Sequence, residues 1–241
     1  MPAPAPEPFI IAQTAGDGYL QTSPELCMKR LMAAGYPKIF QICKCFRKGE
    51  RGKRHLEEFS MLEWYEARAD YRDLMRHCEA LFRCIGHRLG TNGRIHYNNR
   101  HIDICSSWER MSVAAAFDRY APMTMEAALA SDQFDEMIAF EIEPHLGNHS
   151  PVFLYDYPAA ACPLAAPRPD KPHLAQRFEL YVAGLELCNG FTELTDPAEQ
   201  RRRFAEELER RKQSSEPVTP MPEIFLEIFP DAGGGRQCFR P

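Results

Sequence analysis

The side chains best suited to chemistry lie in residues 41–65, where basic, acidic and aromatic types alternate over a short distance. Arg47 follows a short apolar run, residues 42–46, that is typical of a strand. Residues 48–54 then combine several basic side chains with one glutamate and two glycines, a composition that favours a hairpin loop. A guanidinium fixed at the base of such a loop can hold a phosphate group through two charge-assisted hydrogen bonds. The stretch is therefore a candidate site for a polyphosphate.

Other residues of the same hairpin are suited to binding a nucleobase. Glu50 or Glu58 could accept a hydrogen bond from an amine such as the exocyclic group of adenine, and Phe59 could stack on the ring. The alternative is a solvated hairpin whose charges only keep it soluble, which is the more common meaning of a charge run. The order of aromatic, arginine, acid, histidine and Glu-Phe along the chain favours the binding site.

A second stretch, residues 177–196, places carboxylates near the end of a predicted strand. Alternating apolar residues predict two strands joined at Gly184, and a regular second strand would place Glu186, Cys188 and Gly190 on one face. Glu186 could hold Mg²⁺ that bridges phosphates, and Glu193 could pair with a substrate ammonium. Both could equally be ordinary charges at the edge of a sheet.

The elements that must position these residues include a helix that begins near Ser23. Ser23 is predicted as its N-cap, with Pro24 at the first helical position, Glu25 in the first turn and Gly35 as the stop. Capping alone would explain Ser23 and Glu25. A helix N-terminus also favours a carboxylate ligand, so a role in a binding pocket is compatible with capping.

The remaining pattern predicts further strands and helices around these stretches. Small helices are expected around Trp108 and residues 113–117, with two more in residues 123–142 that close at Pro144. Strands are expected at residues 19–22, 59–65 and 151–157, with a strand pair around Asn98 and Asn99, and helices at residues 71–89, 197–212 and 223–229.

The hairpin resembles motif 2 of the class II aminoacyl-tRNA synthetases, in which Phe-Arg and an acidic loop residue precede His-x-x-Glu-Phe. Residues 186–196 resemble the pattern Glu-Leu-x-Asn-Gly-Phe-x-Glu-Leu-x-Asp, which lysyl-tRNA synthetases share. Within the class, the chain is most similar to the elongation factor P lysine ligases. The residues that match motif 2 are Phe46, Arg47, Glu50, His55, Glu58, Phe59, Glu63, Trp64 and Tyr65.

The resemblance implies an α+β fold, with a mainly antiparallel sheet flanked by helices, and an ATP-dependent enzyme. In that family lysine or (R)-β-lysine is activated with ATP and Mg²⁺ and joined to a lysine of elongation factor P. The implied catalytic residue is Arg47, and Glu186 is the implied metal ligand. The resemblance assigns ATP binding to Arg47, Lys48, Gly49, Glu50, His55, Glu58, Phe59, Glu186 and Leu187, and substrate binding to Ser23, Pro24, Glu25, Tyr65, Asn189, Gly190 and Glu193.

The chain departs from the family pattern near both ends. It begins at or just beyond the proline of motif 1, and residues 230–241 do not follow motif 3, whose arginine grips the γ-phosphate. The expected core is therefore incomplete, and the usual homodimer stays an open alternative. A degenerate paralogue that only binds a nucleotide or a protein, or a tRNA-charging enzyme, is the other candidate. We expect tRNA not to be a partner because the chain starts inside the catalytic core.

Composition bounds these expectations. The 241 residues, 44% hydrophobic and 26% charged, suit one catalytic domain over residues 1–241, with a helical insertion at residues 108–146. A net charge of −5 argues against a broad nucleic-acid surface. Nine cysteines without zinc-finger spacing indicate buried free thiols in a reducing cytoplasm. No apolar run approaches the roughly 20 residues of a membrane span, so no membrane association is expected.

Overall fold

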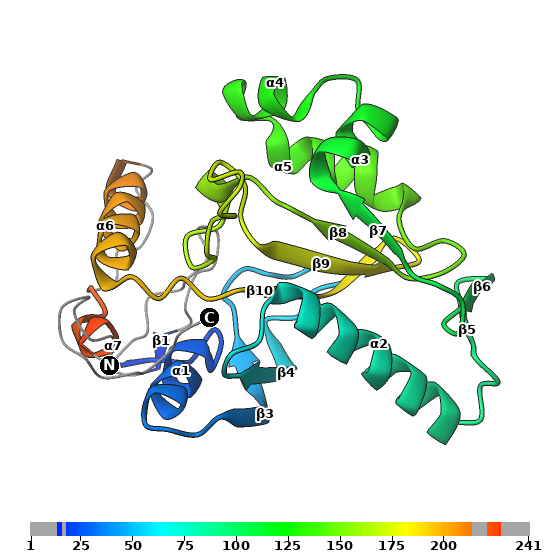
Figure 1. Ribbon diagram of the computed structural model, residues 1–241, viewed down its shortest axis with the longest axis horizontal. Coiled ribbons are helices and arrows are strands. Elements are labelled where there is room, and N and C mark those ends of the chain that lie inside the picture. The colour runs from blue at the N-terminus through cyan, green and yellow to red at the C-terminus, as the bar shows by residue number, and fades with distance from the viewer. Residues whose placement is uncertain (1–13, 16–17, 214–220, 228–241) are drawn as a thin grey trace. The chain divides into compact units, whose positions relative to one another are not determined.

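The computed structural model describes residues 14–15, 18–213 and 221–227 (Figure 1). Its contacts divide the chain into two compact units, Met1–Arg68 with Leu194–Pro241, and Ala69–Glu193. The expectation of one catalytic domain over the whole chain stays a prediction, and the expectations for motif 1 at the start of the chain and for residues 230–241 lie outside the described residues.

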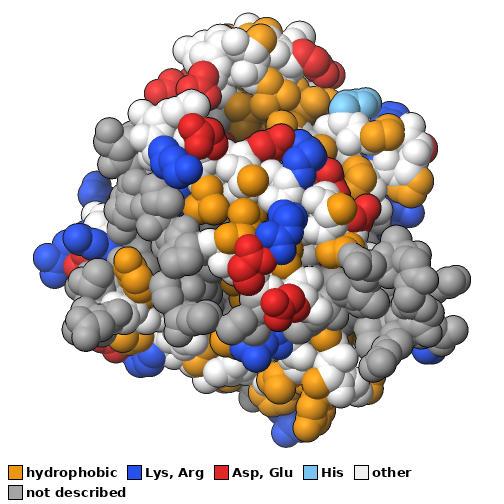
Figure 2. Space-filling view, turned by 90° about the vertical axis from the view of Figure 1, so that its left-hand side faces the viewer, with side chains coloured by type: hydrophobic (Ala, Val, Ile, Leu, Met, Phe, Trp, Pro, Cys, Tyr) orange, Lys and Arg blue, Asp and Glu red, His pale blue; other side chains and the backbone are white. Residues whose placement is uncertain are grey.

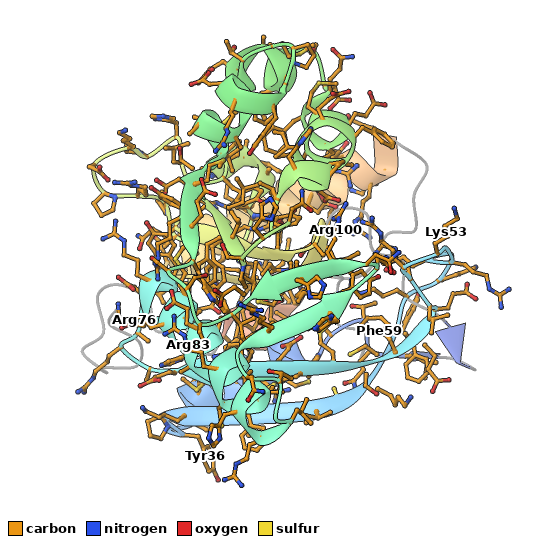
Figure 3. All side chains as sticks on the ribbon, turned by 90° about the vertical axis from the view of Figure 1, so that its right-hand side faces the viewer. Tyr36, Lys53, Phe59, Arg76, Arg83 and Arg100 are labelled. Carbon is orange, nitrogen blue, oxygen red and sulfur yellow. The ribbon has the colours of Figure 1, made fainter. Side chains whose placement is uncertain are left out.

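The first unit is organised around a long two-stranded antiparallel ribbon. Strands β3, Lys38–Phe46, and β4, Glu58–Glu66, pair without interruption from Lys38 opposite Glu66 to Phe46 opposite Glu58. Figure 3 shows Lys53 in the loop at one end of the ribbon and Tyr36 at the other end. The other elements of this unit are β1, Thr14–Ala15, β2, Gly18–Tyr19, α1, Glu25–Ala33, α6, Pro197–Gln213, and α7, Glu223–Leu226.

The ribbon has two different faces because successive side chains of a strand point to opposite sides. One face carries the pairs Cys45–Phe59, Gln41–Glu63 and Ile39–Tyr65, so Phe59, Glu63 and Tyr65 of β4 lie on the same side. The other face carries the apolar pairs Phe40–Trp64 and Ile42–Leu62, with Glu58 beyond them. Phe59, which is predicted to stack on a base, and Tyr65, which is predicted to bind the amino acid, therefore share one face of β4, and Glu58 does not.

The second unit is a four-stranded sheet with helices beside it. The strand order is β10-β9-β8-β7, antiparallel except for the parallel pair β7–β8. Helix α2 runs alongside the sheet, and the helices α3, α4 and α5 gather in a separate group (Figure 1). The bounds are α2, Tyr71–Arg88, β5, Arg94–Tyr97, β6, Arg100–Asp103, β7, Glu109–Ser112, α3, Val113–Tyr120, α4, Met125–Ala130, α5, Phe134–Glu136, the π-helix η1, Met137–Ile142, the 3-10 helices η2, Glu143–His145, and η3, Ala159–Ala161, β8, Val152–Tyr155, β9, Arg177–Val182, and β10, Leu185–Phe191.

Local sequence explains the start of α2 and the packing beneath it. Asp70 accepts hydrogen bonds from the backbone N–H groups of Arg72 and Asp73, and the Asp73 side chain accepts one from Asp70 N, which completes a capping box. In the sheet, the Phe153 ring packs edge-on against Phe178, with a centroid distance of 5.3 Å, and both are almost completely buried. The aromatic core fixes strands β8 and β9 against each other.

The predicted fold class is confirmed, since most strand pairs are antiparallel and helices accompany them. The strand pair around Asn98 and Asn99 is also confirmed, with both residues at positive φ in a tight turn. The predicted strand at residues 19–22 is wrong beyond Tyr19. The helical region expected from Trp108 begins instead with a strand, β7, in which Met111 is buried between the exposed Arg110 and the half-buried Ser112.

Three smaller expectations differ from the structure. Pro24, and not Ser23, occupies the N-cap position of α1, although the Ser23 hydroxyl still accepts a hydrogen bond from Glu25 N at 3.0 Å. Pro144 does not close the helical segment, because a proline is tolerated in the first turn of η2. Among the described cysteines, all free, Cys27, Cys84 and Cys105 are exposed, which contradicts a wholly buried set of thiols.

Candidate functional site

The predicted site residues fall into two groups, one in each unit. The first group belongs to the β3–β4 ribbon and to the start of α1. The second group belongs to β10 and to the residues that follow it. The structure defines the geometry within each group.

Arg47, directly after β3, is held by contacts on several sides. Its backbone N–H donates to Glu57 O at 2.9 Å, and its Nε donates to the Thr22 carbonyl at 3.3 Å. Its guanidinium carbon lies 5.2 Å from the centroid of the Phe59 ring, and Nη1 lies 3.8 Å from the Glu50 carboxylate. The structure thus brings together Arg47, Glu50 and Phe59, which the sequence analysis had proposed on motif spacing.

The loop after Arg47 shows why one of its predicted residues is a glycine. Gly49 has φ +83°, a conformation that side chains rarely adopt, and its N–H donates to Glu57 Oε1 at 2.8 Å. Lys48 and His55 are exposed in this loop. Glu58 lies on the face of the ribbon opposite Phe59, 3.2 Å from Lys44. The structure therefore does not bring Glu58 to the base-stacking side, whereas Glu50 does approach the arginine.

A cluster around Glu63 connects α1 to the ribbon. The Ser23 hydroxyl donates to Glu63 Oε1 at 2.5 Å, and the Tyr65 hydroxyl donates to Oε2 at 2.8 Å. Glu25, in the first turn of α1, lies 2.6 Å from Lys29 Nζ. Sequence analysis quoted Glu63 in motif 2 without assigning it a role. The period-two alternation that joins Phe59, Glu63 and Tyr65 was the available signal.

The electrostatic environment of Glu63 is unusual for a carboxyl group. Burial raises the pKa of Glu63 above its ordinary value of 4.5, and the nearby Glu25 carboxylate raises the pKa further. Hydrogen bonds from Ser23 and Tyr65 and the Lys29 ammonium act in the opposite direction but do not cancel the effect. A half-buried carboxylate has lost part of its hydration, so a bound cation can offset its charge.

This pKa shift predicts how stability depends on pH. A carboxyl group whose pKa is higher in the folded state lowers the free energy of unfolding when it is ionised. This destabilisation is complete above the pKa of the folded state and is absent below 4.5. We therefore expect Glu63→Gln to have a higher free energy of unfolding than the wild type at pH 7. The difference should shrink as the pH falls toward 4.5, as urea titrations at several pH values would measure. Glu58→Gln, from the opposite face, is the control, and a difference that grew on acidification would contradict the assignment.

In the second unit a bulge changes the faces of β10. Glu186 pairs with Tyr181, but Cys188 pairs with Leu180, so the register shifts at the intervening residue, Leu187. Since paired residues share a face, Glu186 and Asn189 lie on the same side. The prediction that Glu186, Cys188 and Gly190 share a face is wrong. It assumed a regular strand, and alternation reverses at the extra residue.

Glu179 of β9 lies on that same face and is buried, with 6% exposure. Its carboxylate accepts hydrogen bonds from the hydroxyls of Tyr157, at 2.5 Å, and Tyr181, at 2.7 Å, and from Arg177 at 2.6 Å. Burial, and next the Glu179 charge, raise the pKa of both tyrosines, which therefore stay protonated donors. Sequence analysis missed Glu179 as a site residue. The signal was its place two residues from Tyr181 in a strand whose partner carries Glu186.

Comparison of the sequence with known proteins identifies the family. The family model for class II tRNA synthetases (D, K and N) matches residues 3–237. The chain belongs to this family. The chain is 36% identical over 233 residues to the elongation factor P–(R)-β-lysine ligase of Edwardsiella ictaluri. The alignment covers 90% of this chain and 69% of that protein.

Two further relatives are a second β-lysine ligase and a lysine–tRNA ligase. The elongation factor P–(R)-β-lysine ligase of Pseudoalteromonas translucida is 37% identical over 214 residues, or 86% of this chain and 66% of that protein. The lysine–tRNA ligase of Staphylococcus haemolyticus is 32% identical over 257 residues, or 95% of this chain and 51% of that protein. The class II synthetase chain thus spans about two thirds of the β-lysine ligases and about half of the tRNA ligase.

Gly190, one of the residues predicted to bind the substrate, has a structural reason to be glycine. A Cβ on Gly190 would lie 2.7 Å from Phe178 Cε1 and 2.8 Å from Cζ. The Phe178 ring is 1% exposed and cannot move aside easily. Glu193 follows in a bridge opposite Ala165, next to Thr192, whose hydroxyl accepts a hydrogen bond from Tyr71 N at 3.0 Å.

Gly190→Ala is therefore expected to reduce the free energy of unfolding by about 1–3 kcal/mol, the usual cost of overpacking a core. Urea unfolding measures the loss. Gly52→Ala is the matched control, because nothing lies within 4 Å of the added methyl group. Equal stability of the two variants would show that the strand shifts freely at Gly190.

Across residues 14–15, 18–213 and 221–227, no helix is long and apolar enough to cross a membrane. In the same part of the chain, no three His, Cys, Asp or Glu side chains lie together as a ready-made metal site.

Proposed function

We propose that the chain activates lysine or (R)-β-lysine with ATP, releases pyrophosphate, and joins the aminoacyl group to a lysine side chain of elongation factor P. The observation that carries the proposal is the arrangement on the ribbon. Arg47 lies over Phe59, while Phe59, Glu63 and Tyr65 occupy one face of β4. A phosphate-binding cation, a stacking ring and an ammonium-binding carboxylate therefore follow one another along a single strand pair. The names of the ligase relatives support the acceptor.

The proposed reaction has two steps, and each needs positioning more than acid or base groups. The amino-acid carboxylate attacks the α-phosphorus of ATP, and the bond to pyrophosphate breaks. An amine of the acceptor then attacks the aminoacyl carbonyl carbon, AMP leaves with the bonding electrons, and the amine loses a proton to solvent. Arg47 binds an oxygen of the α-phosphate and offsets the charge that develops there. Phe59 stacks on adenine, and Glu50 accepts from its amine.

The residues of β10 fit a magnesium ion held together with nucleotide phosphates. Magnesium commonly takes one or two protein carboxylates and completes its shell with phosphate oxygens and water. Glu186 is exposed, and Glu179 lies on the same face with its oxygens already engaged by Tyr157, Tyr181 and Arg177. We assign Glu186 as the metal ligand. Leu187, in the bulge, is assigned to contact ATP. The ion would supply charge neutralisation for the phosphates.

The amino acid is proposed to bind at the Glu63 cluster. Ser23, Pro24 and Glu25 would border the pocket from α1, and Tyr65 from β4. Glu63 would receive a substrate ammonium, because its burial favours a cation that offsets its charge. Asn189, Gly190 and Glu193, at the end of β10 and just after it, are likewise proposed to bind the substrate.

The acceptor is assigned by similarity and charge. The chain is 36% identical to the Edwardsiella β-lysine ligase and 32% identical to the Staphylococcus tRNA ligase. Its net charge is −5, and on the face shown in Figure 2 basic and acidic side chains are interspersed among the described residues. A tRNA-binding surface would concentrate basic side chains. A translation factor as acceptor also places the proposed activity in the cytoplasm.

The test is amino-acid-dependent exchange of labelled pyrophosphate into ATP, with lysine, (R)-β-lysine and a wider amino-acid panel. Exchange with one of the lysines supports activation. Transfer of the labelled amino acid is then measured to elongation factor P, to the factor with its acceptor lysine changed to arginine, and to lysine tRNA. Label on the unmodified factor alone supports the proposal, and label on tRNA alone replaces it with tRNA charging. No exchange with any amino acid would leave only a binding protein.

A further inference from the structure

The β5–β6 hairpin carries two histidines that the proposed function does not use. His96 of β5 and His101 of β6 lie directly opposite each other in the antiparallel pairing. Both residues are exposed, and their ring centroids lie 4.1 Å apart with an angle of 74° between the planes. Imidazole nitrogens are the ligands that zinc, nickel and copper ions favour in proteins. Two such rings side by side are therefore a candidate site for a divalent transition metal ion.

The turn places the two histidines at the closer kind of cross-strand pair. Residues 98–99 have φ of 43° and 60°, the two positive values that a two-residue type I′ turn requires. The residues that flank such a turn, here Tyr97 and Arg100, close it as a hydrogen-bonded pair. Hydrogen-bonded and non-hydrogen-bonded pairs alternate along an antiparallel ladder, so His96 and His101 form a non-hydrogen-bonded pair. Side chains approach most closely at such a pair, where the Cα atoms are roughly 4.5 Å apart.

The opposite face of the hairpin is anchored, so the two histidines stand on a fixed backbone. Ile95 and Ile102 alternate with them, and Ile102 is completely buried in a cluster with Val182 and Ala183. The Arg100 guanidinium also donates to the Ala183 carbonyl at 3.0 Å. An arriving ion would therefore meet two ligands on strands that are already in place, and only side-chain torsions need to adjust.

We propose that His96 and His101 together bind one divalent transition metal ion of the zinc type, with water completing its shell. Zinc–nitrogen bonds of about 2.0–2.1 Å require the two ligand nitrogens to be about 3 Å apart, which ring rotation provides between neighbouring imidazoles. Two protein ligands are fewer than a resident zinc ion usually takes, so the ion exchanges with solvent. The bound ion joins β5 to β6 and stabilises the hairpin.

This site differs in chemistry from the magnesium position proposed at Glu186. Magnesium prefers oxygen ligands and dehydrates reluctantly, whereas zinc and nickel accept neutral imidazole. An excess of Mg²⁺ should therefore leave the histidine pair free for Zn²⁺ or Ni²⁺. The inference does not depend on the proposed function, because binding is measured without ATP, an amino acid or an acceptor.

The test is calorimetric titration of the full chain with Zn²⁺ and with Ni²⁺, in excess Mg²⁺ and a phosphine reductant. We expect the affinity to fall by about tenfold or more in His96→Ala and equally in His101→Ala, because each imidazole raises the effective concentration of the other at a shared ion. The double variant should lose little beyond either single variant. His87→Ala, which removes an exposed histidine of α2, is the matched control and should bind like the wild type.

Thermal unfolding provides the second measurement. Without metal, the hairpin variants should unfold at the same temperature as the wild type, because both histidines are exposed. Added Ni²⁺ should raise the unfolding temperature of the wild type and not that of the double variant, since an ion that binds only the folded hairpin stabilises it. Additive losses from the two single variants would indicate two separate histidine sites. Additive losses, unchanged binding in the double variant, or no binding by the wild type would each overturn the inference.

Discussion

Arg47→Ala is expected to lower amino-acid-dependent pyrophosphate exchange by about 10²–10³-fold, the usual effect of removing one preorganised donor from a developing charge. The structure gives the physical reason, since the guanidinium lies over the Phe59 ring and its Nε donates to the Thr22 carbonyl. A side chain held in advance loses little entropy when it binds a phosphate. The measurement is the rate of exchange at saturating ATP and amino acid.

Two variants control for that result. Arg47→Lys keeps the charge but loses the planar fork, and it should recover only part of the rate. Lys53→Ala, in the exposed loop, should stay within a few-fold of the wild type, because a solvated charge contributes little. Circular dichroism of each variant excludes unfolding. If Arg47→Ala kept the wild-type rate, the hairpin would not be the phosphate-binding element, and the proposed function would lose its main support.

Glu179→Ala is expected to reduce the free energy of unfolding by about 3–5 kcal/mol, the usual cost of removing one partner of a buried ion pair. The change would leave the Arg177 guanidinium without this carboxylate, and it would leave the hydroxyls of Tyr157 and Tyr181 without the oxygen to which they donate. Arg177 Nε is already buried without a hydrogen-bond partner, so the site has little spare capacity. Urea unfolding monitored by fluorescence gives the value.

The interpretation of that loss needs two further variants. Glu179→Gln keeps an acceptor oxygen and should lose less stability than the alanine variant. Replacing both partners, Arg177→Met with Glu179→Leu, should recover much of the loss, because no unpaired charge stays behind. A loss below about 1 kcal/mol for Glu179→Ala would indicate that water enters and solvates the cluster, and the network would then not be a stability element.

Local sequence determined much of the fold. The apolar run of residues 42–46 and the return of a strand-like pattern at residues 59–65 indicated two strands with a charged loop between them, and the structure has β3 and β4 there. Asn98 and Asn99 marked their hairpin because asparagine tolerates positive φ. Helix α2 was readable from its 3.6-residue period. These signals act over a few residues, so no tertiary contact is needed to interpret them.

The elements that the sequence analysis missed depend on distant partners. Strand β7 is four residues long and pairs in parallel with β8, about 40 residues later in the chain, so its local pattern did not separate it from a helix start. The bulge at Leu187 is equally invisible to a periodicity argument, because one extra residue changes no residue type. Both features altered which side chains share a face.

The candidate site divides in the same way. Sequence alone determined the residue types, since Arg47, Phe59 and Tyr65 stand at motif spacing on one hairpin, whose register follows from direct pairing of its strands. Only the tertiary structure decided that Glu63 receives the Ser23 hydroxyl and that burial raises its pKa, because α1 and β4 are joined across 40 residues. Likewise, only the pairing of β9 with β10 placed Glu179 and Glu186 on one face. The sequence specifies which side chain stands at each position. Burial and neighbouring charge shift the pKa of that side chain, and they arise from contacts between segments distant in sequence.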